Sequence, residues 1–258
     1  MKIKNGNENK NDLLPAKKSV VSESINDFIW CFFGDRKIGK SLTASMFENT
    51  LFLPLEPGHK SMSIYKTKPI TSWEQFMSII VLLEQDEKYE TIAIDPCFPL
   101  YNLCYEYTLR ELDIEDIKED DWGSAWSVIR KNFEDSNNRL VSIGKGIIYI
   151  AHSEVTVFKR KGGMETHKFK MDLGKQAKRY IAGIVDIIVF FHYDENGNRV
   201  MTIEGDDYNE AGHRCKDHFK YTNGDRVRNI PMGDDESEAH ENLMLAFSNK
   251  LKKLENLK

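Results

Sequence analysis

Short apolar runs alternate with longer stretches of mixed polarity along most of the chain. The runs at residues 28–33, 91–95, 146–151 and 184–191 are continuous enough to predict strands that are buried on both faces. Between them, apolar side chains recur at helical spacing, as they do from residue 73 to residue 83. Strands that alternate with helices predict an α/β fold in which a mostly parallel sheet is flanked by helices.

The pattern changes near both ends of the chain. Residues 1–22 are rich in Asn, Lys and Ser, which predicts a disordered leader before a core that spans residues 23–232. Within that core, NRVMTIEG follows the turn DENGN and predicts a β-hairpin extension. Residues 233–258 are expected to form a C-terminal amphipathic helix, whose apolar positions are Ala239, Leu243, Phe247, Leu251 and Leu254.

Composition limits the class of protein. The chain has 258 residues, of which 40% are hydrophobic, and this suffices for a substantial core. No apolar run approaches the roughly 18 residues of a membrane helix and no hydrophobic signal segment opens the chain, so we expect a cytoplasmic protein that does not engage a membrane. The four cysteines are scattered without a C-x-x-C pair, which favours reduced thiols.

Charge is unevenly distributed. The net charge of −5 argues against a protein that binds nucleic acid over its whole surface, because phosphate contacts require an excess of Lys and Arg. Residues 159–179 nevertheless hold eight Lys or Arg and only two acids, Glu165 and Asp172. This segment is either a local phosphate-binding surface or, as charged runs commonly are, a solvated one.

One short segment carries a nucleotide-binding motif. The sequence FFGDRKIGKSL fits G-x-x-x-x-G-K-[ST], in which backbone N–H groups and a lysine surround a triphosphate. It lies between an apolar strand and the start of a helix, as the motif requires; the alternative is an ordinary glycine turn beside a lysine. The predicted cofactors are ATP and Mg²⁺, with Lys40 at the β- and γ-phosphates and Ser41 on the metal. The predicted nucleotide-binding residues are Gly34, Asp35, Arg36, Lys37, Ile38, Gly39, Lys40, Ser41 and Leu42.

Three polar residues follow apolar strands directly and are expected to share one edge of the sheet with this loop. Asp95 is placed to hold Mg²⁺ opposite Ser41, unless it merely caps the next helix. Glu56 could orient or deprotonate the water that attacks the γ-phosphate, and its alternative is a solvated turn acid. His152 could sense the γ-phosphate, or it could be an ordinary hydrogen-bonded residue at the end of a strand.

A small cluster of possible metal ligands lies near the C-terminus. His213, Cys215 and His218 form H-x-C-x-x-H. A closed zinc site needs four ligands and no second pair stands nearby in the sequence, so we do not predict zinc there.

The segments GDRKIGKS, LFLPLEPG, TIAIDP, GIIYIAHSE and YIAGIVDIIVFF, in this order, resemble the RecA-like P-loop ATPases. They are most similar to phage-encoded nucleotide-binding proteins of that group, which are often described as single-strand annealing proteins. The resemblance implies a RecA-like fold over residues 26–230. It also implies that Glu56 activates water, that Asp95 is the Walker B acid and that His152 stands where the family commonly has a glutamine.

The resemblance further implies a contact with single-stranded DNA. In RecA-like proteins the loop after the sensor binds the strand, and here it corresponds to residues 158–179. Gly162 and Gly163 would make this loop mobile, its lysines would contact phosphates and Phe169 would stack on a base. The predicted nucleic-acid-binding residues are Lys159, Arg160, Lys161, Lys168, Phe169 and Lys170.

Departures from the family pattern affect the expected partners. The sequence has no recognisable oligomerisation domain and no separate DNA-binding domain, which puts filament formation and strand exchange in doubt. Family members complete the site across a subunit boundary with a basic residue, so we expect a homo-oligomer in which Lys175, Arg214 or Lys216 has that role. A single-strand binding or replication protein is a further possible partner.

Three hypotheses follow from the sequence. The first is an Mg²⁺-dependent ATPase that binds single-stranded DNA and assists annealing or recombination. The second is a P-loop kinase that transfers the γ-phosphoryl group to a small acceptor and has little need of Glu56. The third is a non-catalytic ATP-binding protein that docks a replication or repair partner through residues 111–121 and the terminal helix.

Overall fold

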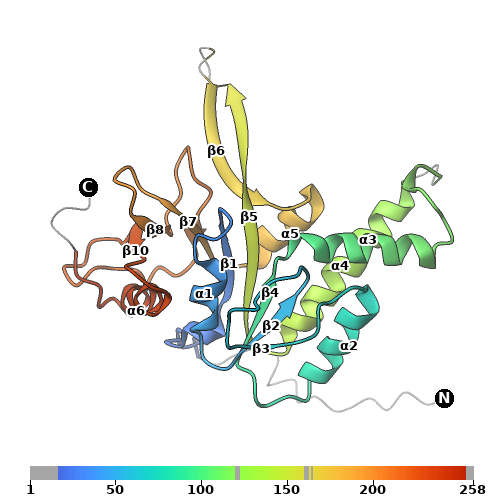
Figure 1. The fold of residues 1–258 in the computed structure, drawn as a ribbon, viewed down its shortest axis with the longest axis horizontal. Coiled ribbons are helices and arrows are strands. Elements are labelled where there is room, and N and C mark those ends of the chain that lie inside the picture. Colours follow the sequence, from blue (N-terminus) through green and yellow to red (C-terminus); the bar gives the residue numbers. More distant parts are fainter. Residues whose placement is uncertain (1–16, 120–122, 160–162, 164, 254–258) are drawn as a thin grey trace.

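The fold was analysed in a computed structural model, which describes residues 17–119, 123–159, 163 and 165–253 (Figure 1). Its centre is one sheet with strand order β10-β8-β7-β1-β5-β4-β2-β3, while β6 pairs with β5 and β9 with β7. The strands are β1 (Ile29–Gly34), β2 (Thr50–Pro54), β3 (Tyr65–Lys66), β4 (Thr91–Asp95), β5 (Gly146–Lys159), β6 (Glu165–Asp172), β7 (Ile187–Tyr193), β8 (Arg199–Thr202), β9 (Gly212–His213) and β10 (Asn229–Pro231).

Helices lie on both faces of this sheet (Figure 1). They are α1 (Lys40–Ser45), α2 (Trp73–Leu83), α3 (Phe98–Glu111), α4 (Ser124–Ser142), α5 (Lys175–Ile184) and α6 (Glu236–Phe247), with short 3₁₀ turns at Ile25–Asp27 and Ile117–Glu119. The strands from β7 across to β3 pair in parallel, and β8 and β10 extend the sheet in antiparallel fashion. The predicted α/β class, the mostly parallel sheet and the β7–β8 hairpin are thus confirmed.

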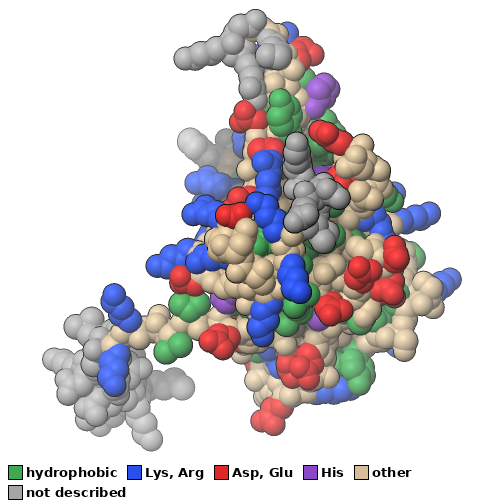
Figure 2. Space-filling model, turned by 90° about the vertical axis from the view of Figure 1, so that its left-hand side faces the viewer, with side chains coloured by type: hydrophobic (Ala, Val, Ile, Leu, Met, Phe, Trp, Pro, Cys, Tyr) green, Lys and Arg blue, Asp and Glu red, His purple; other side chains and the backbone are tan. Residues whose placement is uncertain are grey.

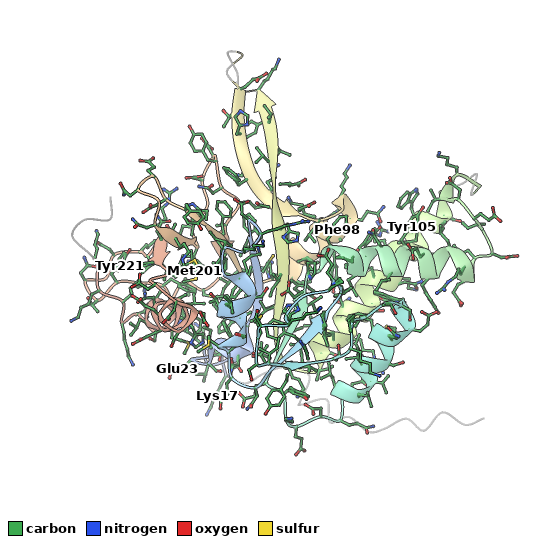
Figure 3. The ribbon with its side chains drawn as sticks, in the orientation of Figure 1. Lys17, Glu23, Phe98, Tyr105, Met201 and Tyr221 are labelled. Atoms are coloured by element: carbon green, nitrogen blue, oxygen red, sulfur yellow. The ribbon has the colours of Figure 1, made fainter. Side chains whose placement is uncertain are left out.

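The two cores explain the continuous apolar runs. Successive side chains of a strand point to opposite faces, so Trp30 and Phe32 of β1 pack in the core that contains α1 and α6. Cys31 and Phe33 pack in the second core, against residues from α2 to α5. Figure 3 shows the side chains dense between sheet and helices and projecting outward along the β5–β6 hairpin.

The structure differs from expectation at several strands and at the last helix. The short strands β3, β9 and β10 were not predicted, and β5 continues to Lys159 although its apolar run ends at residue 151. Helix α6 ends at Phe247, before the predicted Leu251, because Asn249 takes a left-handed conformation (φ 61°) and the Leu251 N–H donates back to the Leu245 carbonyl. Leu251 still reaches the core; Leu254 and residues 1–16 of the predicted leader lie outside the described residues.

Residues 158–179 are not the single loop that we expected. Within the described part, β5 runs to Lys159, β6 runs antiparallel to it from residue 165, and α5 begins at Lys175. The hairpin formed by residues 153–159 and 165–171, called the arm below, projects beyond the sheet (Figure 1). Of the helices in the described ranges, none is long and apolar enough to span a membrane.

Candidate nucleotide-binding site

The phosphate-loop motif forms a tight turn between β1 and α1. Gly34 ends β1 with φ 150°, and a Cβ atom there would lie 2.1 Å from the Phe191 carbonyl oxygen. Glycine is therefore needed for β1 to pair with β7 at this point. The turn closes at Gly39 (φ 117°), which immediately precedes α1.

Lys40 is folded into this turn. Its side chain is buried, and Nζ donates to the carbonyl oxygens of Gly34 (2.9 Å) and Asp35 (2.6 Å). Burial lowers the pKa of Lys40 to about 8, although the nearby charges of Asp95 and Asp35 oppose this shift. The ammonium group thus lies at the centre of the loop that the motif assigns to phosphates.

Asp95 is the meeting point of three elements. Ser41 Oγ of α1 donates to Asp95 Oδ2 at 2.5 Å, and His59 Nε2 lies 2.7 Å from the same oxygen. Because a carboxylate only accepts, the imidazole N–H donates here. Cys97, and not Asp95, stands at the N-cap of α3, so the capping alternative does not describe this carboxylate.

His59 was missed by the sequence analysis. It lies in the β2–β3 loop in a left-handed conformation (φ 58°), its side chain is 9% exposed, and its Nδ1 atom has no hydrogen-bond partner among the described residues. Lys66 Nζ donates to the His59 carbonyl oxygen at 2.8 Å and so restrains the β2–β3 loop. The only signal in the sequence was a polar residue soon after a strand that ends at this edge.

Glu56 and His152 flank this centre without a hydrogen bond between them in the described structure. Glu56 follows β2 and is exposed, whereas His152 is half-buried and pairs in register with Gly34. Burial lowers the pKa of His152, and Lys40 and Arg36 lower it further, while Glu56 and Asp95 act in the opposite direction. Glu56, His152, Asp95 and the phosphate loop therefore lie within electrostatic reach of one another.

The phosphate loop is tied to the arm. Ser153 Oγ donates to Asp35 Oδ1 at 2.5 Å, and His152 pairs with Asp172 where the arm begins. A change in the loop can thus reach the arm through one hydrogen bond and one strand.

The predicted nucleic-acid-binding residues are dispersed over the arm. Lys159 pairs with Glu165 (3.6 Å), and Lys168 Nζ donates to the Asp206 carbonyl oxygen (3.0 Å). Phe169 stacks on Phe190 at 5.5 Å, and so packs against the protein where we expected a free platform for a base. The remaining predicted residues are Lys170, opposite Glu154 in the arm, and Arg160 and Lys161, which lie outside the described residues.

The three basic residues expected to act across a subunit boundary lie in different places. Lys175 opens α5 and lines a cavity of about 480 Å³ together with Trp126, Arg130 and Arg179. Arg214 donates to the Gly183 carbonyl oxygen, and Lys216 lies beyond β9. Their distribution does not single out one of them.

The H-x-C-x-x-H cluster is engaged in backbone contacts. His218 touches the carbonyl oxygens of Phe247 (2.8 Å) and Ser22 (3.0 Å), and His213 Nδ1 accepts from the Cys215 N–H (3.2 Å). Among the residues that the structure describes, no group of three His, Cys, Asp or Glu side chains is arranged to hold a metal ion.

The loop fits a nucleotide with Mg²⁺. Two glycines with positive φ allow the backbone N–H groups of the loop to approach a phosphate, and the buried Lys40 supplies positive charge. Ser41 and Asp95 offer the hard oxygen ligands that Mg²⁺ prefers, two protein groups being the usual number where phosphates complete the shell. These features, together with the sheet, are those of an α/β P-loop domain with a nucleotide-binding loop at the carboxyl end of β1.

Comparison with known proteins identifies the family of the chain. Residues 28–215 match the family AAA_24, described as an AAA domain, and because this span is well over half of the 258 residues the chain belongs to that family. A search of curated proteins found no significant match. A KaiC-like protein, PH0186 of the hyperthermophilic archaeon Pyrococcus horikoshii OT3, is similar in structure with a TM-score of 0.41 and 13% identity, over 80% of this chain and 85% of that one.

Proposed function

We propose that the protein hydrolyses ATP with Mg²⁺, binds single-stranded DNA and assists annealing or recombination, as its resemblance to phage-encoded annealing proteins implies. The observation that carries the ATPase part is the shared Asp95 oxygen, which accepts from Ser41 at the start of α1. Two hard oxygen ligands next to a buried lysine are what an Mg²⁺–triphosphate complex requires.

Each polar side chain at the carboxyl edge of the sheet then has a role in binding or hydrolysing ATP. Lys40 leaves the carbonyls of Gly34 and Asp35 to contact phosphate oxygens, and its positive charge offsets the charge that develops on them. Ser41 and Asp95 would hold Mg²⁺, which would supply further neutralisation of the phosphate charge. Glu56 orients the attacking water and accepts its proton, and His152 responds to the γ-phosphate.

The DNA-binding part is assigned to the arm and to the groove between α4 and α5. The arm alone is weakly suited, because the described residues 153–159 and 165–171 contain few cations that are not paired or bonded. The groove adds Lys175 and Arg179, together with Arg130, which is 4.0 Å from Glu134. These residues surround Trp126, whose side chain is exposed and can stack on a base. Basic and acidic side chains are intermixed on the face drawn in Figure 2, so a local surface fits better than a broad basic one.

The test is phosphate release from ATP and Mg²⁺, measured with and without single-stranded DNA in low salt and near physiological salt. We expect DNA to stimulate release and salt to weaken the stimulation, because phosphate contacts release counterions. Lys40→Ala should abolish release and ATP binding. Lys60→Ala, which removes an exposed lysine from the β2–β3 loop, is the matched control and should retain both.

The same assay separates the alternatives. A phosphorylated small acceptor in place of free phosphate would establish the kinase. Retained ATP binding with slow hydrolysis that Glu56→Gln does not change would establish the non-catalytic protein. DNA affinity that is unchanged by ATP and by Lys40→Ala would remove the link between the two ligands.

A further inference from the structure

A small cavity of about 150 Å³ lies at the amino-terminal end of β7, where β9 pairs with that strand. The phosphate loop follows the carboxyl end of β1, which runs parallel to β7, so the two sites lie at opposite edges of the sheet. The volume is below the roughly 300–1,000 Å³ of sites for drug-sized molecules. It therefore suits one small ionic group rather than a whole nucleotide.

The lining of this cavity is basic. It includes four cations, those of Arg214, Lys216, Lys220 and Arg226, and one carboxylate, that of Glu204. Glu204 lies 3.7 Å from Arg226 and offsets part of the charge. The described lining keeps an excess of three positive charges, which favours an anionic ligand.

Other carboxylates nearby do not neutralise this excess. Asp225 pairs with Lys253 at 2.7 Å, and Asp186 accepts from the Ile29 N–H at 3.0 Å. Asp217 is exposed and is not among the described residues that line the cavity. The positive charge is thus available to a ligand that enters from solvent.

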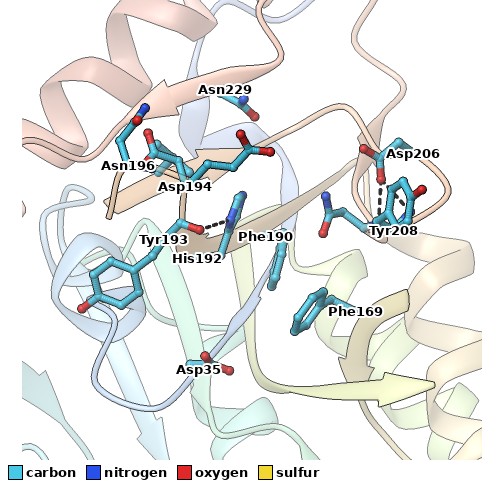
Figure 4. Close-up of a pocket in the computed structure, with 13 residues that line it drawn as sticks. Asp35, Phe169, Phe190, His192, Tyr193, Asp194, Asn196, Asp206, Tyr208 and Asn229 are labelled. Carbon is cyan, nitrogen blue, oxygen red and sulfur yellow. Dashed lines mark hydrogen bonds between the residues drawn. The ribbon is translucent and has the colours of Figure 1, made fainter. Parts of the chain in front are cut away.

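The cavity beside the phosphate loop has the opposite charge. It measures about 560 Å³, and its described lining contains four carboxylates, those of Asp35, Asp194, Glu195 and Asp206, and no Lys or Arg (Figure 4). Such a lining repels a phosphate group. Of these two cavities, the small basic one is therefore the candidate for binding an anion.

Two of the cations are held close to one another by the backbone. Lys220 and Arg226 are partners in an antiparallel β-bridge, an arrangement that like charges destabilise. Phe219, which precedes Lys220, is buried at φ 58°, a conformation that bulky residues rarely adopt. Repulsion and backbone strain of this kind are typical of functional sites, and a bound anion would offset the repulsion.

The turn between β9 and Phe219 is fixed by His218. Its ring nitrogens contact the carbonyl oxygens of Phe247 (2.8 Å) and Ser22 (3.0 Å), and its ring stacks on that of Phe247 at 3.9 Å. His218 therefore holds the scaffold, and we do not count it among the groups that bind the anion.

Three side chains of the lining have donors to offer. Lys216 and Lys220 make no side-chain hydrogen bond or ion pair within the described part of the chain. Burial lowers the pKa of His213, Arg226 adds to this shift and Glu204 opposes it, so the ring is neutral at pH 7. Its Nδ1 atom accepts from the Cys215 N–H at 3.2 Å, which leaves the proton on Nε2 as a donor.

We propose that this cavity binds a single phosphoryl group, separately from the triphosphate at the phosphate loop. A phosphate monoester carries about −1.5 to −2 charge at pH 7 and three acceptor oxygens, which match a basic lining with three free donors better than a phosphodiester does. Lys216 and Lys220 supply the charge, and His213 donates a neutral hydrogen bond. The group is either inorganic phosphate or the 5′-terminal phosphate of a single strand; the second source rests on the proposed function.

The first experiment titrates the isotope-labelled full chain with inorganic phosphate and follows the backbone N–H resonances by NMR. ADP and Mg²⁺ are present throughout to occupy the phosphate loop, and sodium chloride keeps the ionic strength constant. We expect the resonances of residues 213–220 to shift with one dissociation constant, whereas shifts at residues 34–42 report the phosphate loop. Lys220→Gln should raise that dissociation constant about tenfold, as expected for the loss of one charge-assisted hydrogen bond.

Lys88→Gln is the matched control, because Lys88 is an exposed lysine just before β4, at the same edge of the sheet but outside the cavity. It should leave the dissociation constant unchanged. The proposal is overturned if phosphate shifts no resonance of residues 213–220, or if it binds Lys220→Gln as tightly as the original chain. Equal shifts with chloride alone would also overturn it, because the cavity would then have no preference for phosphate.

A second experiment distinguishes the two sources of the phosphoryl group. Two oligodeoxynucleotides with a fluorescent label at the 3′ end, one with and one without a 5′-phosphate, are compared by fluorescence anisotropy. If the 5′-phosphate strengthens binding and Lys220→Gln removes the gain, the cavity holds the end of a strand. If both bind equally while inorganic phosphate still binds, the ligand is free phosphate. If neither strand binds, the proposed DNA-binding function is wrong and the phosphate site stands.

Discussion

The two halves of β5 show how the same strand serves two different regions. Residues 146–151 are buried and pair with β1 and, over most of their length, with β4. Residues 153–159 pair with β6 alone, and Val155 and Val157 are about half exposed. Residues 146–151 of β5 are therefore fixed between two neighbouring strands, whereas residues 153–159 pair with one strand within the described part of the chain. We call residues 146–151, which have a neighbouring strand on each side, the closed half of β5, and residues 153–159 the open half. A fixed geometry is expected in the closed half and adaptable contacts in the open half.

The largest loss of stability should come from a substitution beside the closed half of β5, at Gly34, which pairs with β5 and β7. Gly34→Ala places a Cβ 2.1 Å from the Phe191 carbonyl oxygen, and backbone atoms cannot yield as a flexible side chain can. We expect a loss of about 3 kcal/mol or more in the free energy of unfolding, measured by urea denaturation. At Gly163, which lies between the two strands of the arm in the sequence, an added Cβ meets no atom within 4 Å and only the positive φ (86°) is strained, so Gly163→Ala should cost about 1 kcal/mol. Equal losses would contradict the contrast between the two halves.

The nucleotide edge was largely predictable because its signals are local. The phosphate-loop pattern fixes a turn through two glycines, and the strand that ends at Asp95 matches the predicted run. His59 was not predictable in the same way, because its contact with Asp95 depends on a left-handed residue in a loop between two strands. A loop conformation of that kind leaves no periodic trace in the sequence.

The arm was missed although a signal existed. Val155 and Val157 alternate with polar residues, as do Phe169 and Met171, and this period of two is typical of strands. The many lysines and the resemblance both favoured a loop. Composition indicated the charge of the segment correctly but not how the fold distributes it among the two strands and α5.

The second prediction concerns how Asp95 is held. His59→Gly removes the imidazole without adding strain, because glycine tolerates positive φ. We expect Mn²⁺, used as a spectroscopic probe for Mg²⁺ with ADP present, to bind about tenfold more weakly by electron paramagnetic resonance, since partners of metal ligands contribute roughly 10- to 100-fold. His59→Asn keeps a side-chain N–H and tolerates the backbone, so it should recover part of the affinity. Unchanged Mn²⁺ affinity in His59→Gly would show that His59 does not position Asp95.

The third prediction tests the link between the two regions. Ser153→Ala removes the hydrogen bond to Asp35. One net hydrogen bond contributes about 1 kcal/mol, so stimulation of phosphate release by DNA should fall about fivefold while release without DNA stays within about twofold. Thr156→Ala is the control, because its hydroxyl bonds within the arm. Equal effects of both variants would mean that the arm acts without this bond.

The smallest effect concerns stability in acid, where buried histidines differ from an exposed histidine on the arm. Burial lowers the pKa of His152, His192 and His240 below the ordinary value of about 6.5. Between pH 6.5 and 5 the unfolded chain therefore binds more protons than the folded one, so these residues make stability fall as the pH drops through that range. The urea midpoint should decrease from pH 7 to pH 5, and His240→Gln should flatten the slope.

His167→Gln is the control for that slope, because His167 is exposed on the arm. It should leave the pH dependence unchanged. Carboxylates with lowered pKa values, such as Asp86 and Asp194, titrate below this range and do not interfere. If His167→Gln flattened the slope as much as His240→Gln, the acid sensitivity would not arise from the burial of histidines, and the contrast between the two regions would be confined to their contacts.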